Sequence, residues 1–253
     1  MKDDGSTYDL ELAEILSNPE FGVDEDERRQ NLRAAKLSTT ILAGSTIAVF
    51  FLAVIFSTAY WRISMLALLA PPWIGLLLFL KFPVLRMFHG SRSRRCAYPS
   101  LDLPFVVSAF GVISVGSVFG HLVSLWPVVY AAILPGLLVA GVFVGLVPYI
   151  RRSVLLWLFF VVFGLFYSGG AIVFANAYYD HSPATLHWAK VVGKYVSHGK
   201  HTSYHLDLSP WLDSDETESV TVPSNFYQAK NVGDPVEVLT RPGFLKIQWY
   251  TLR

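Results

Sequence analysis

Five long stretches of this chain contain no Asp, Glu, Lys or Arg. Each has at least about 18 residues, enough for a helix to cross the roughly 30 Å hydrocarbon core of a bilayer. Only 15% of all residues are charged, 53% are hydrophobic and the mean hydropathy is +0.44, which excludes an ordinary soluble domain. The stretches are Thr39–Tyr60, Ile63–Leu80, Phe105–Leu125, Val128–Ile150 and Ser153–Ala175. The sequence therefore predicts an α-helical membrane protein with five transmembrane helices.

Two further absences limit how the chain is processed and stabilised. Residues 1–38 are polar and acidic and lack an apolar stretch, so we expect no cleaved signal peptide and a first span that inserts as a true transmembrane helix. Cys96 is the single cysteine, which excludes a disulfide within the chain. We expect Cys96 to be a reduced thiol in a cytoplasmic loop.

Positive charge is missing from alternate connections between the spans. Only Arg62 lies between the first two spans, and Val123–Pro127 carries no charge. The other connections hold Arg28, Arg29, Arg33 and Lys36 before span one, Lys81, Arg86, Arg92, Arg94 and Arg95 after span two, and Arg151 and Arg152 after span four. The positive-inside rule then predicts an inner (plasma) membrane protein with a cytoplasmic N-terminus and an extracytoplasmic C-terminus. We expect an N-terminal arm (1–37), a transmembrane domain (38–177) and an exported domain (178–253).

The exported segment changes from helical to alternating periodicity. Its short runs are rich in Val, Tyr, Trp, Thr and Leu and are separated by turn residues. The runs are Leu186–Val196, Ser203–Leu208, Ser219–Val222, Pro235–Thr240 and Phe244–Leu252. Five short strands predict a small antiparallel β-barrel of the OB or SH3-like kind, with a turn at Pro242 and Gly243 joining the last two strands.

This arrangement, with a Val-Gly-Asp-Pro-Val-Glu-Val stretch at residues 232–238, resembles uncharacterised bacterial multi-pass membrane proteins with a C-terminal small β domain, and more loosely NfeD-type proteins. The resemblance covers the architecture and about a dozen residues around Val232–Val238. It implies that the β domain acts as an interaction module rather than as a catalyst. No site residue is carried over from it.

Ionisable groups are nearly missing from the predicted spans, where His121 is the only one. Transporters and pumps usually hold several such groups at membrane depth. We therefore expect His121 to be an interfacial or interhelical hydrogen-bonding residue, with a proton or ligand role as the alternative. Pro71 and Pro72 must kink or break the second span. A packing kink is the commoner explanation of such a pair, and a broken helix lining a transport site is the alternative.

Small residues recur in the last three spans at four-residue spacing, where close approach of backbones supplies packing in lipid. They are Gly116 and Gly120 in span three, Gly136 and Ala140 in span four, and Gly164 and Ser168 in span five. We expect these residues to pack the spans into one unit, and a homo-oligomer interface is the alternative.

Histidines gather in the exported segment. On an extended strand His201, His205 and Asp207 project from one face, and such a set could bind Zn²⁺ or Cu²⁺. Solvated histidines near a hairpin turn are the commoner reading, so we expect no cofactor and keep metal binding as the alternative. The acidic loop of Asp213, Asp215, Glu216 and Glu218 is expected to be solvated, with weak Ca²⁺ binding as its alternative.

Catalytic motifs are absent from the sequence, which has no Ser-His-Asp order, His-Glu-x-x-His pattern or phosphate-binding glycine loop. The short basic cluster at residues 90–95 is explained by topology, so we expect no nucleic-acid binding. The prediction is a non-enzymatic membrane protein that presents its β domain to a protein partner, in an accessory, assembly or toxin-immunity role. The alternative is an oligomeric transporter or channel subunit with the β domain as a cap.

Overall fold

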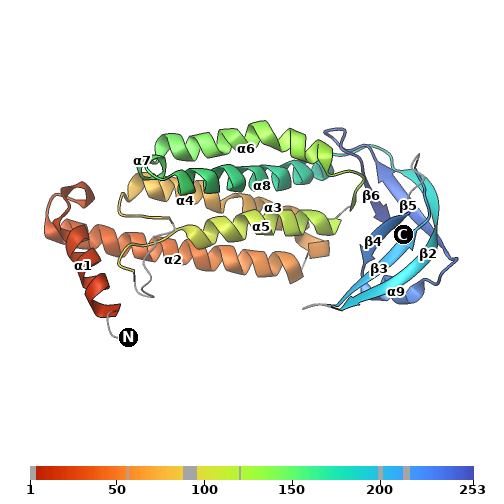
Figure 1. Ribbon diagram of the computed structural model, residues 1–253, viewed down its shortest axis with the longest axis horizontal. Helices are drawn as coiled ribbons and strands as arrows, with labels where there is room; N and C mark the ends of the chain where they lie inside the picture. The colour runs from red at the N-terminus through yellow and green to blue at the C-terminus, as the bar shows by residue number, and fades with distance from the viewer. Residues whose placement is uncertain (1–3, 56, 88–95, 120, 199–201, 213–216) are drawn as a thin grey trace. The chain divides into compact units, whose positions relative to one another are not determined.

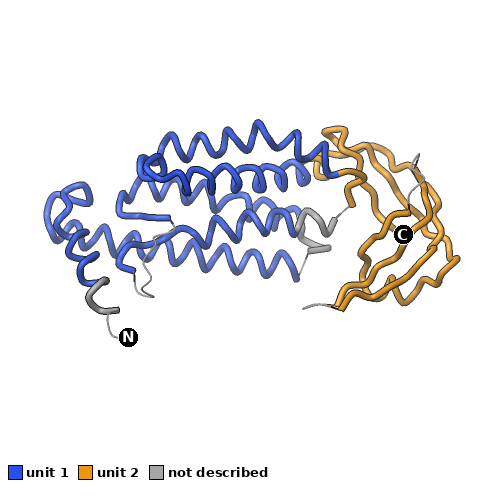
Figure 2. The backbone as a smooth tube through the Cα atoms, in the orientation of Figure 1, with its two compact units in different colours: residues 1–119, 125–175 blue, residues 120–124, 176–253 orange. Residues whose placement is uncertain are grey.

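The computed structural model describes residues 4–55, 57–87, 96–119, 121–198, 202–212 and 217–253. The chain divides into two compact units (Figure 2). The helical unit contains residues 1–119 and 125–175, and the β unit contains residues 120–124 and 176–253.

Helices account for nearly all of the helical unit, and α2, α5, α6 and α8 run along one another (Figure 1). The elements are α1 (Asp4–Ser17), the 3-10 helix η1 (Pro19–Phe21), α2 (Glu25–Ile55), α3 (Ser57–Leu69), α4 (Pro71–Lys81), α5 (Asp102–Phe119), α6 (Trp126–Leu146), α7 (Pro148–Arg151) and α8 (Val154–Tyr178).

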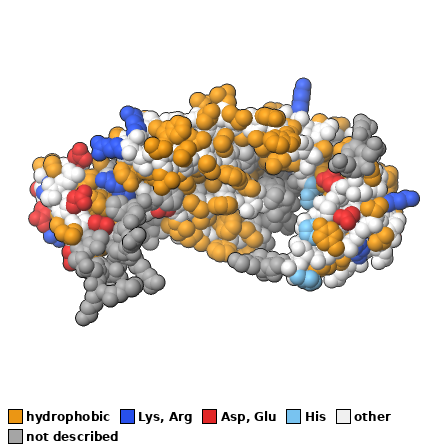
Figure 3. Space-filling view, in the orientation of Figure 1, with side chains coloured by type: hydrophobic (Ala, Val, Ile, Leu, Met, Phe, Trp, Pro, Cys, Tyr) orange, Lys and Arg blue, Asp and Glu red, His pale blue; other side chains and the backbone are white. Residues whose placement is uncertain are grey.

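Four segments among the described residues are long and apolar enough to cross a membrane: Glu25–Ile55, Arg62–Lys81, Trp126–Leu146 and Val154–Tyr178. The third predicted span corresponds to α5, whose described apolar part, Asp102–Ser114, is shorter. Apolar side chains cover the visible surface of these helices (Figure 3). The prediction of a helical domain with helices long and apolar enough to cross a membrane is confirmed, and five crossings remain a prediction.

The first membrane helix begins well before the apolar stretch. The Asp24 side chain accepts a hydrogen bond from the Glu27 amide (2.7 Å), and the Glu27 carboxylate accepts one from the Val23 amide (2.6 Å). This reciprocal cap satisfies amides that a helix start leaves unpaired. Helix α2 then continues without a break to Ile55, through the boundary expected at residue 37.

The N-terminal arm packs against its own unit. Ile15 and Phe21 are buried in the core of the helical unit, and Glu11 accepts a hydrogen bond from the Ala97 amide (2.8 Å). The Arg86 guanidinium lies 5.7 Å from the ring centre of Phe21. Burial of the arm therefore depends on partners about 65 and 86 residues further along the chain, which a local sequence pattern does not reveal.

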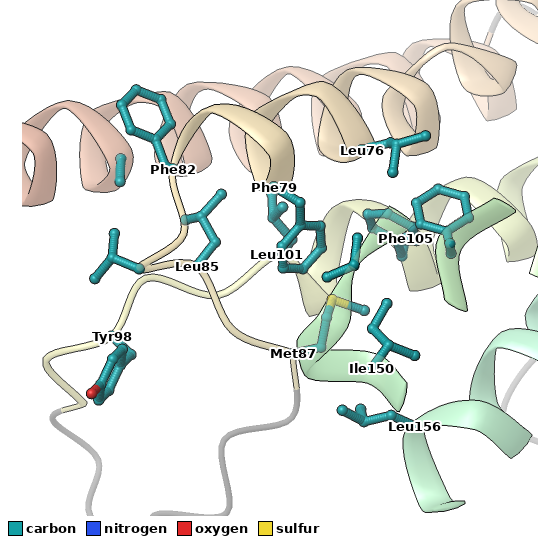
Figure 4. Close-up of a cluster of buried hydrophobic side chains, with 14 of the residues drawn as sticks. Leu76, Phe79, Phe82, Leu85, Met87, Tyr98, Leu101, Phe105, Ile150 and Leu156 are labelled. Carbon is teal, nitrogen blue, oxygen red and sulfur yellow. The ribbon is translucent and has the colours of Figure 1, made fainter. Parts of the chain in front are cut away.

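Aromatic and branched apolar side chains fill the interior of the helical unit. The rings of Phe143 and Phe160 stack with 4.9 Å between centroids, and Phe105 meets each of them edge to face. Figure 4 shows Met87 and Ile150 beside the same cluster. Packing of this kind ties α5, α6 and α8 to the loop after α4.

The β unit is an antiparallel sheet that forms a half-barrel. Its elements are β1 (His121–Leu122), β2 (Thr185–His198), β3 (Thr202–Leu208), β4 (Glu218–Val222), α9 (Ser224–Ala229), β5 (Pro235–Arg241) and β6 (Trp249–Leu252). The strand order is β1-β6-β5-β2-β3-β4, and every neighbouring pair is antiparallel. The five predicted strands are confirmed, although the last begins at Trp249 rather than Phe244, and α9 was not predicted.

Strand β1 comes from the connection between α5 and α6. His121 pairs with Tyr250 and Leu122 with Trp249, and the Val123 amide donates to the Gln248 carbonyl (3.1 Å). The prediction that the third span runs to Leu125 with His121 inside it is therefore wrong. Backbone pairing with β6, rather than hydropathy, decides the structure of this segment. The β unit therefore includes residues that the expected boundary of 178–253 left out.

Candidate functional site

The outer surface of β2 carries a row of apolar side chains. Ala189 and Val191 of this strand are buried in the core of the β unit, so the residues that alternate with them along the strand point away from it. Leu186 and Trp188 point outward, and the Trp188 side chain is 58% exposed. A half-buried sheet normally places polar residues on this side.

A bulge in β2 places two more exposed side chains, those of Val192 and Tyr195, on the same side of the sheet as Trp188. Val191 pairs with Leu208 but Gly193 pairs with Asp207, so Val192 is an extra residue. One extra residue inverts which side chains face outward, and Tyr195 consequently lies on the same side as Trp188 with 45% of its surface exposed. We call this surface the β2 face and define it by the exposed residues Leu186, Trp188, Val192 and Tyr195.

The Asp207 side chain lies over Gly193 at the bulge. A Cβ atom on Gly193 would lie 2.7 Å from an Asp207 carboxylate oxygen. That oxygen is the end of a rotatable side chain, so a larger residue at this position would require the Asp207 carboxylate to move. Glycine inside a strand often marks a bulge of this kind.

Charged residues border the β2 face. Trp188 is directly opposite Glu237 on β5, and Leu186 is opposite Leu239. Lys190 is exposed on β2 itself. An apolar centre with tryptophan and tyrosine and a charged rim is the composition typical of a protein-binding surface.

Polar side chains join the three strands beside Tyr195. The ring of His205 stacks on Tyr195 at 4.6 Å with only 4° between the planes. Its Nε2 lies 3.0 Å from the Ser203 hydroxyl and its Nδ1 lies 3.2 Å from the Thr221 hydroxyl. The Tyr195 hydroxyl lies 3.1 Å from the Ser219 hydroxyl. This network fixes the tyrosine at the edge of the β2 face.

The proposed metal ligands are only partly placed. His205 and Asp207 lie on the outer side of β3, as their spacing predicts, whereas His201 lies outside the described residues. Both ring nitrogens of His205 already have hydroxyl partners. Among the residues that the structure describes, no three His, Cys, Asp or Glu side chains gather closely enough to hold a metal ion.

His121 stacks on Tyr250 within the β unit, with 5.1 Å between ring centroids. Burial lowers the pKa of this histidine from its usual 6.5, because a buried imidazole resists taking up a proton. The Tyr250 hydroxyl in turn donates to the Glu218 carboxylate (2.6 Å), and burial together with that carboxylate raises the Tyr250 pKa. Glu218 of the predicted acidic loop is thus a hydrogen-bond partner of Tyr250. Residues 213–216 of that loop lie outside the residues that the structure describes.

The two prolines in the second span do break the helix. Helix α3 ends at Leu69 and α4 begins at Pro71. Prolines have no amide hydrogen, so carbonyls one turn earlier lose their helical partners. The Ser108 hydroxyl donates to the Leu68 carbonyl and the Tyr167 hydroxyl donates to the Leu69 carbonyl.

A tryptophan completes the hydrogen bonding at this break. The Trp73 indole nitrogen donates to the Tyr167 hydroxyl at 3.0 Å, so that hydroxyl is both donor and acceptor. Side chains of neighbouring helices commonly replace the lost backbone donors in this way. Side chains of neighbouring helices thus donate hydrogen bonds to the Leu68 and Leu69 carbonyls at the break. This arrangement is typical of a packing kink.

The small residues lie at one of the helix contacts that were expected, the one between α6 and α8. A Cβ on Gly136 would come within 2.9 Å of the Leu165 backbone, and one on Gly164 would collide with the Gly136 carbonyl. Ala140 and Ser168 are buried beside this contact. Gly116 lies in α5, and Gly120 lies outside the described residues. Backbone contact between α6 and α8 therefore has no room for a side chain.

Comparison of this chain with protein-family models, with curated proteins and with solved structures found no match.

Proposed function

We propose that the protein is a non-enzymatic integral membrane protein that uses the β2 face to bind another protein outside the cytoplasm. The observation that carries the proposal is the exposed Trp188, aligned with Leu186 and Tyr195 on one side of a single strand. Tryptophan and tyrosine contribute most of the binding energy at protein interfaces when they lie near the centre. The helices provide the membrane anchor. The protein itself acts in an accessory, assembly or toxin-immunity role.

The pairing of β1 with β6 supports the proposed topology independently of charge. His121 and Leu122 pair with β6 in one sheet, so β1 and the C-terminal strand must lie on the same side of a membrane. Between them the chain makes two long apolar helices, α6 and α8, which return it to the side from which it started. Arg151 lies between those helices, on the side where the positive-inside rule expects cytoplasm.

Fusions to a reporter that is active only outside the cytoplasm test this orientation. A reporter placed after Arg253 should be active, and one inserted at residues 91–97 should be silent. Activity of the internal fusion, or silence of the C-terminal one, contradicts the proposed topology.

The alternative of an oligomeric transporter or channel finds little in its favour. It draws on the helix break at Pro71 and Pro72, because broken helices line substrate sites in transporters. Two carbonyls at this break, those of Leu68 and Leu69, already accept hydrogen bonds from Ser108 and Tyr167. A coordinating site needs such carbonyls to be free for an ion, so protein binding is the better proposal.

Quantitative affinity purification from membranes tests the proposed function. Trp188→Ser and Tyr195→Ser should each lose a specific set of co-purifying proteins, because they remove aromatic anchors. The matched control is Val232→Ser, since Val232 is an exposed apolar residue of the same unit but lies in the Asn231–Asp234 turn. Loss of partners that is equal in all three variants, or retention in all three, contradicts binding at the β2 face.

A further inference from the structure

The loop between β5 and β6 carries two large apolar side chains that its own unit does not cover. Phe244 is 59% exposed and Leu245 is 43% exposed. Arg241 and Lys246 flank them in sequence. Exposed neighbouring apolar residues flanked by cations are typical of segments that enter the interfacial region of a membrane.

Hydrogen bonds hold this loop at the end of α8. Asn176 is 1% exposed, and its carbonyl accepts from the Phe244 amide (3.1 Å). The Asn176 side chain accepts from the Leu245 amide (2.9 Å) and donates to the Ile247 carbonyl (2.8 Å). Three bonds from one residue fix the loop against the last turn of that helix.

Asp180 adds a second attachment just beyond the helix. Its carboxylate accepts from the Gly243 amide (3.1 Å) and from the Trp249 indole (2.8 Å). Burial by itself raises the pKa of Asp180, but hydrogen bonds from Ser182, Trp249 and Gly243 outweigh it and leave the pKa below 3.8. The attachment therefore stays charged and intact at neutral pH.

The loop conformation is also constrained internally. Lys246 has a φ of 62°, a region that side chains other than glycine rarely adopt, and its amide donates to the Gly243 carbonyl (3.1 Å). Such a conformation persists only where the surrounding structure enforces it. The exposure of Phe244 and Leu245 is therefore a property of a fixed turn.

The position of Asn176 along α8 identifies what meets these side chains. Asn176 follows Val154 by about 22 residues, or about 33 Å along the helix axis, and a hydrocarbon core is roughly 30 Å thick. A bilayer crossed by α8 therefore ends close to Asn176. Tyr178 and Tyr179 follow, with the Tyr179 ring 5.6 Å from that of Phe244, as aromatic residues do at membrane interfaces.

We infer that Phe244 and Leu245 insert into the interfacial region of the same bilayer that α8 crosses. The partner of this surface is lipid, with Arg241 and Lys246 beside the headgroups. The loop acts as a second anchor that follows the transmembrane helices in the chain. This anchor is distinct from the β2 face, and it needs no protein partner.

Fluorescence of a polarity-sensitive label tests the inference in the full chain. In a Cys96→Ser background, Phe244→Cys and, separately, Leu245→Cys are labelled and reconstituted into phospholipid vesicles without any other protein. Val232→Cys, which is also highly exposed, is the matched control. Labels at 244 and 245 should emit at shorter wavelength than the label at 232, should be quenched by nitroxide-bearing lipids, and should be protected from aqueous iodide.

Two results overturn the inference. Iodide quenching at both loop positions that equals quenching at 232 places the loop in water. A blue shift without quenching by nitroxide lipids means that protein, either a second copy or the chain itself, covers the loop. Adding Asn176→Ala should return the 244 label to water, because the loop then loses its bonds to α8, and an unchanged signal contradicts the role assigned to Asn176.

Discussion

Exposed apolar side chains have different meanings in the two units. In the helical unit they occur along all of the long helices, as at Leu134 on α6 and Leu155 on α8, where we expect a bilayer to solvate them. In the β unit the large exposed apolar side chains that are described belong mainly to β2 and to the β5–β6 loop. We therefore expect the same residue types to form a lipid-facing surface in the helical unit and specific binding surfaces in the β unit.

Polar side chains differ between the units as well. In the helices described, hydroxyls such as those of Thr46 and Ser108 donate to backbone carbonyls, so they stabilise the fold. In the β unit Tyr195, His205 and Thr221 bond through side chains on the outer side of the sheet. This difference favours the proposal that the helices are a scaffold and that the sheet carries the groups that meet a partner.

The largest expected effect concerns the scaffold. Gly136→Ala should destabilise the protein by about 1–3 kcal/mol, because the new methyl group would overlap the backbone of α8 at Leu165. Gly141→Ala on the same helix is the control, since nothing lies within 4 Å of the added atom. Thermal melting in detergent measures both, and equal melting temperatures contradict the described contact of α6 with α8.

A smaller effect concerns the break between α3 and α4. Ser108→Ala should cost about 1–2 kcal/mol, because it leaves the Leu68 carbonyl without its donor. In a Pro72→Ala background the same change should cost less, since the restored amide can serve that carbonyl. Ser45→Ala, which removes a bond to a carbonyl within an unbroken helix, is the control. A Ser108→Ala cost that is equal in both backgrounds contradicts this explanation of the break.

The pH dependence of β1 pairing gives the third effect. Because the folded state lowers the His121 pKa below 6.5, the unfolded state binds a proton first as the pH falls. Stability of the pairing is therefore fully present above about pH 6.5 and decreases below it, until the folded state also becomes protonated. Hydrogen exchange of the Val123 amide, corrected for its intrinsic rate, should report this loss, and His121→Phe should abolish it. Protection that is independent of pH in the original chain contradicts it.

The smallest expected effect on stability is at the β2 face itself. Trp188→Ser should change the free energy of unfolding by no more than about 0.5 kcal/mol, because the side chain is mostly exposed and fills no core space. Thermal melting in detergent measures this change. Tyr250→Phe should destabilise more, since it removes a buried hydroxyl from Glu218. If Trp188→Ser were the more destabilising, Trp188 would belong to the core, and this result would contradict its assignment to a binding surface.

Much of the fold could be predicted from the sequence because its signals are local. Apolar length predicts the spans at α2, α6 and α8, and alternation predicts β2 to β5 within a few residues. The acidic run at Glu25 predicts a helix start because charge acts within one turn. His121 could not be placed in the same way, since pairing with Tyr250 joins segments more than a hundred residues apart.

The candidate site was harder to predict than the fold. Trp188 and Tyr195 are separated by seven positions, which would put them on opposite sides of a regular strand, and the bulge at Val192 that brings them together has no sequence signal except Gly193. Asn176 was missed because a single amide at the end of an apolar run looks like a helix terminus. Its bonds to the β5–β6 loop depend on tertiary structure.

The most direct test of binding at the β2 face is site-specific photo-crosslinking in living cells. A photoreactive amino acid placed at Trp188 should give one discrete adduct with a different protein, and the same amino acid at Val232 should not. An adduct only with a second copy of this chain would indicate self-association instead. No adduct at Trp188, or the same adducts at both positions, would contradict the account.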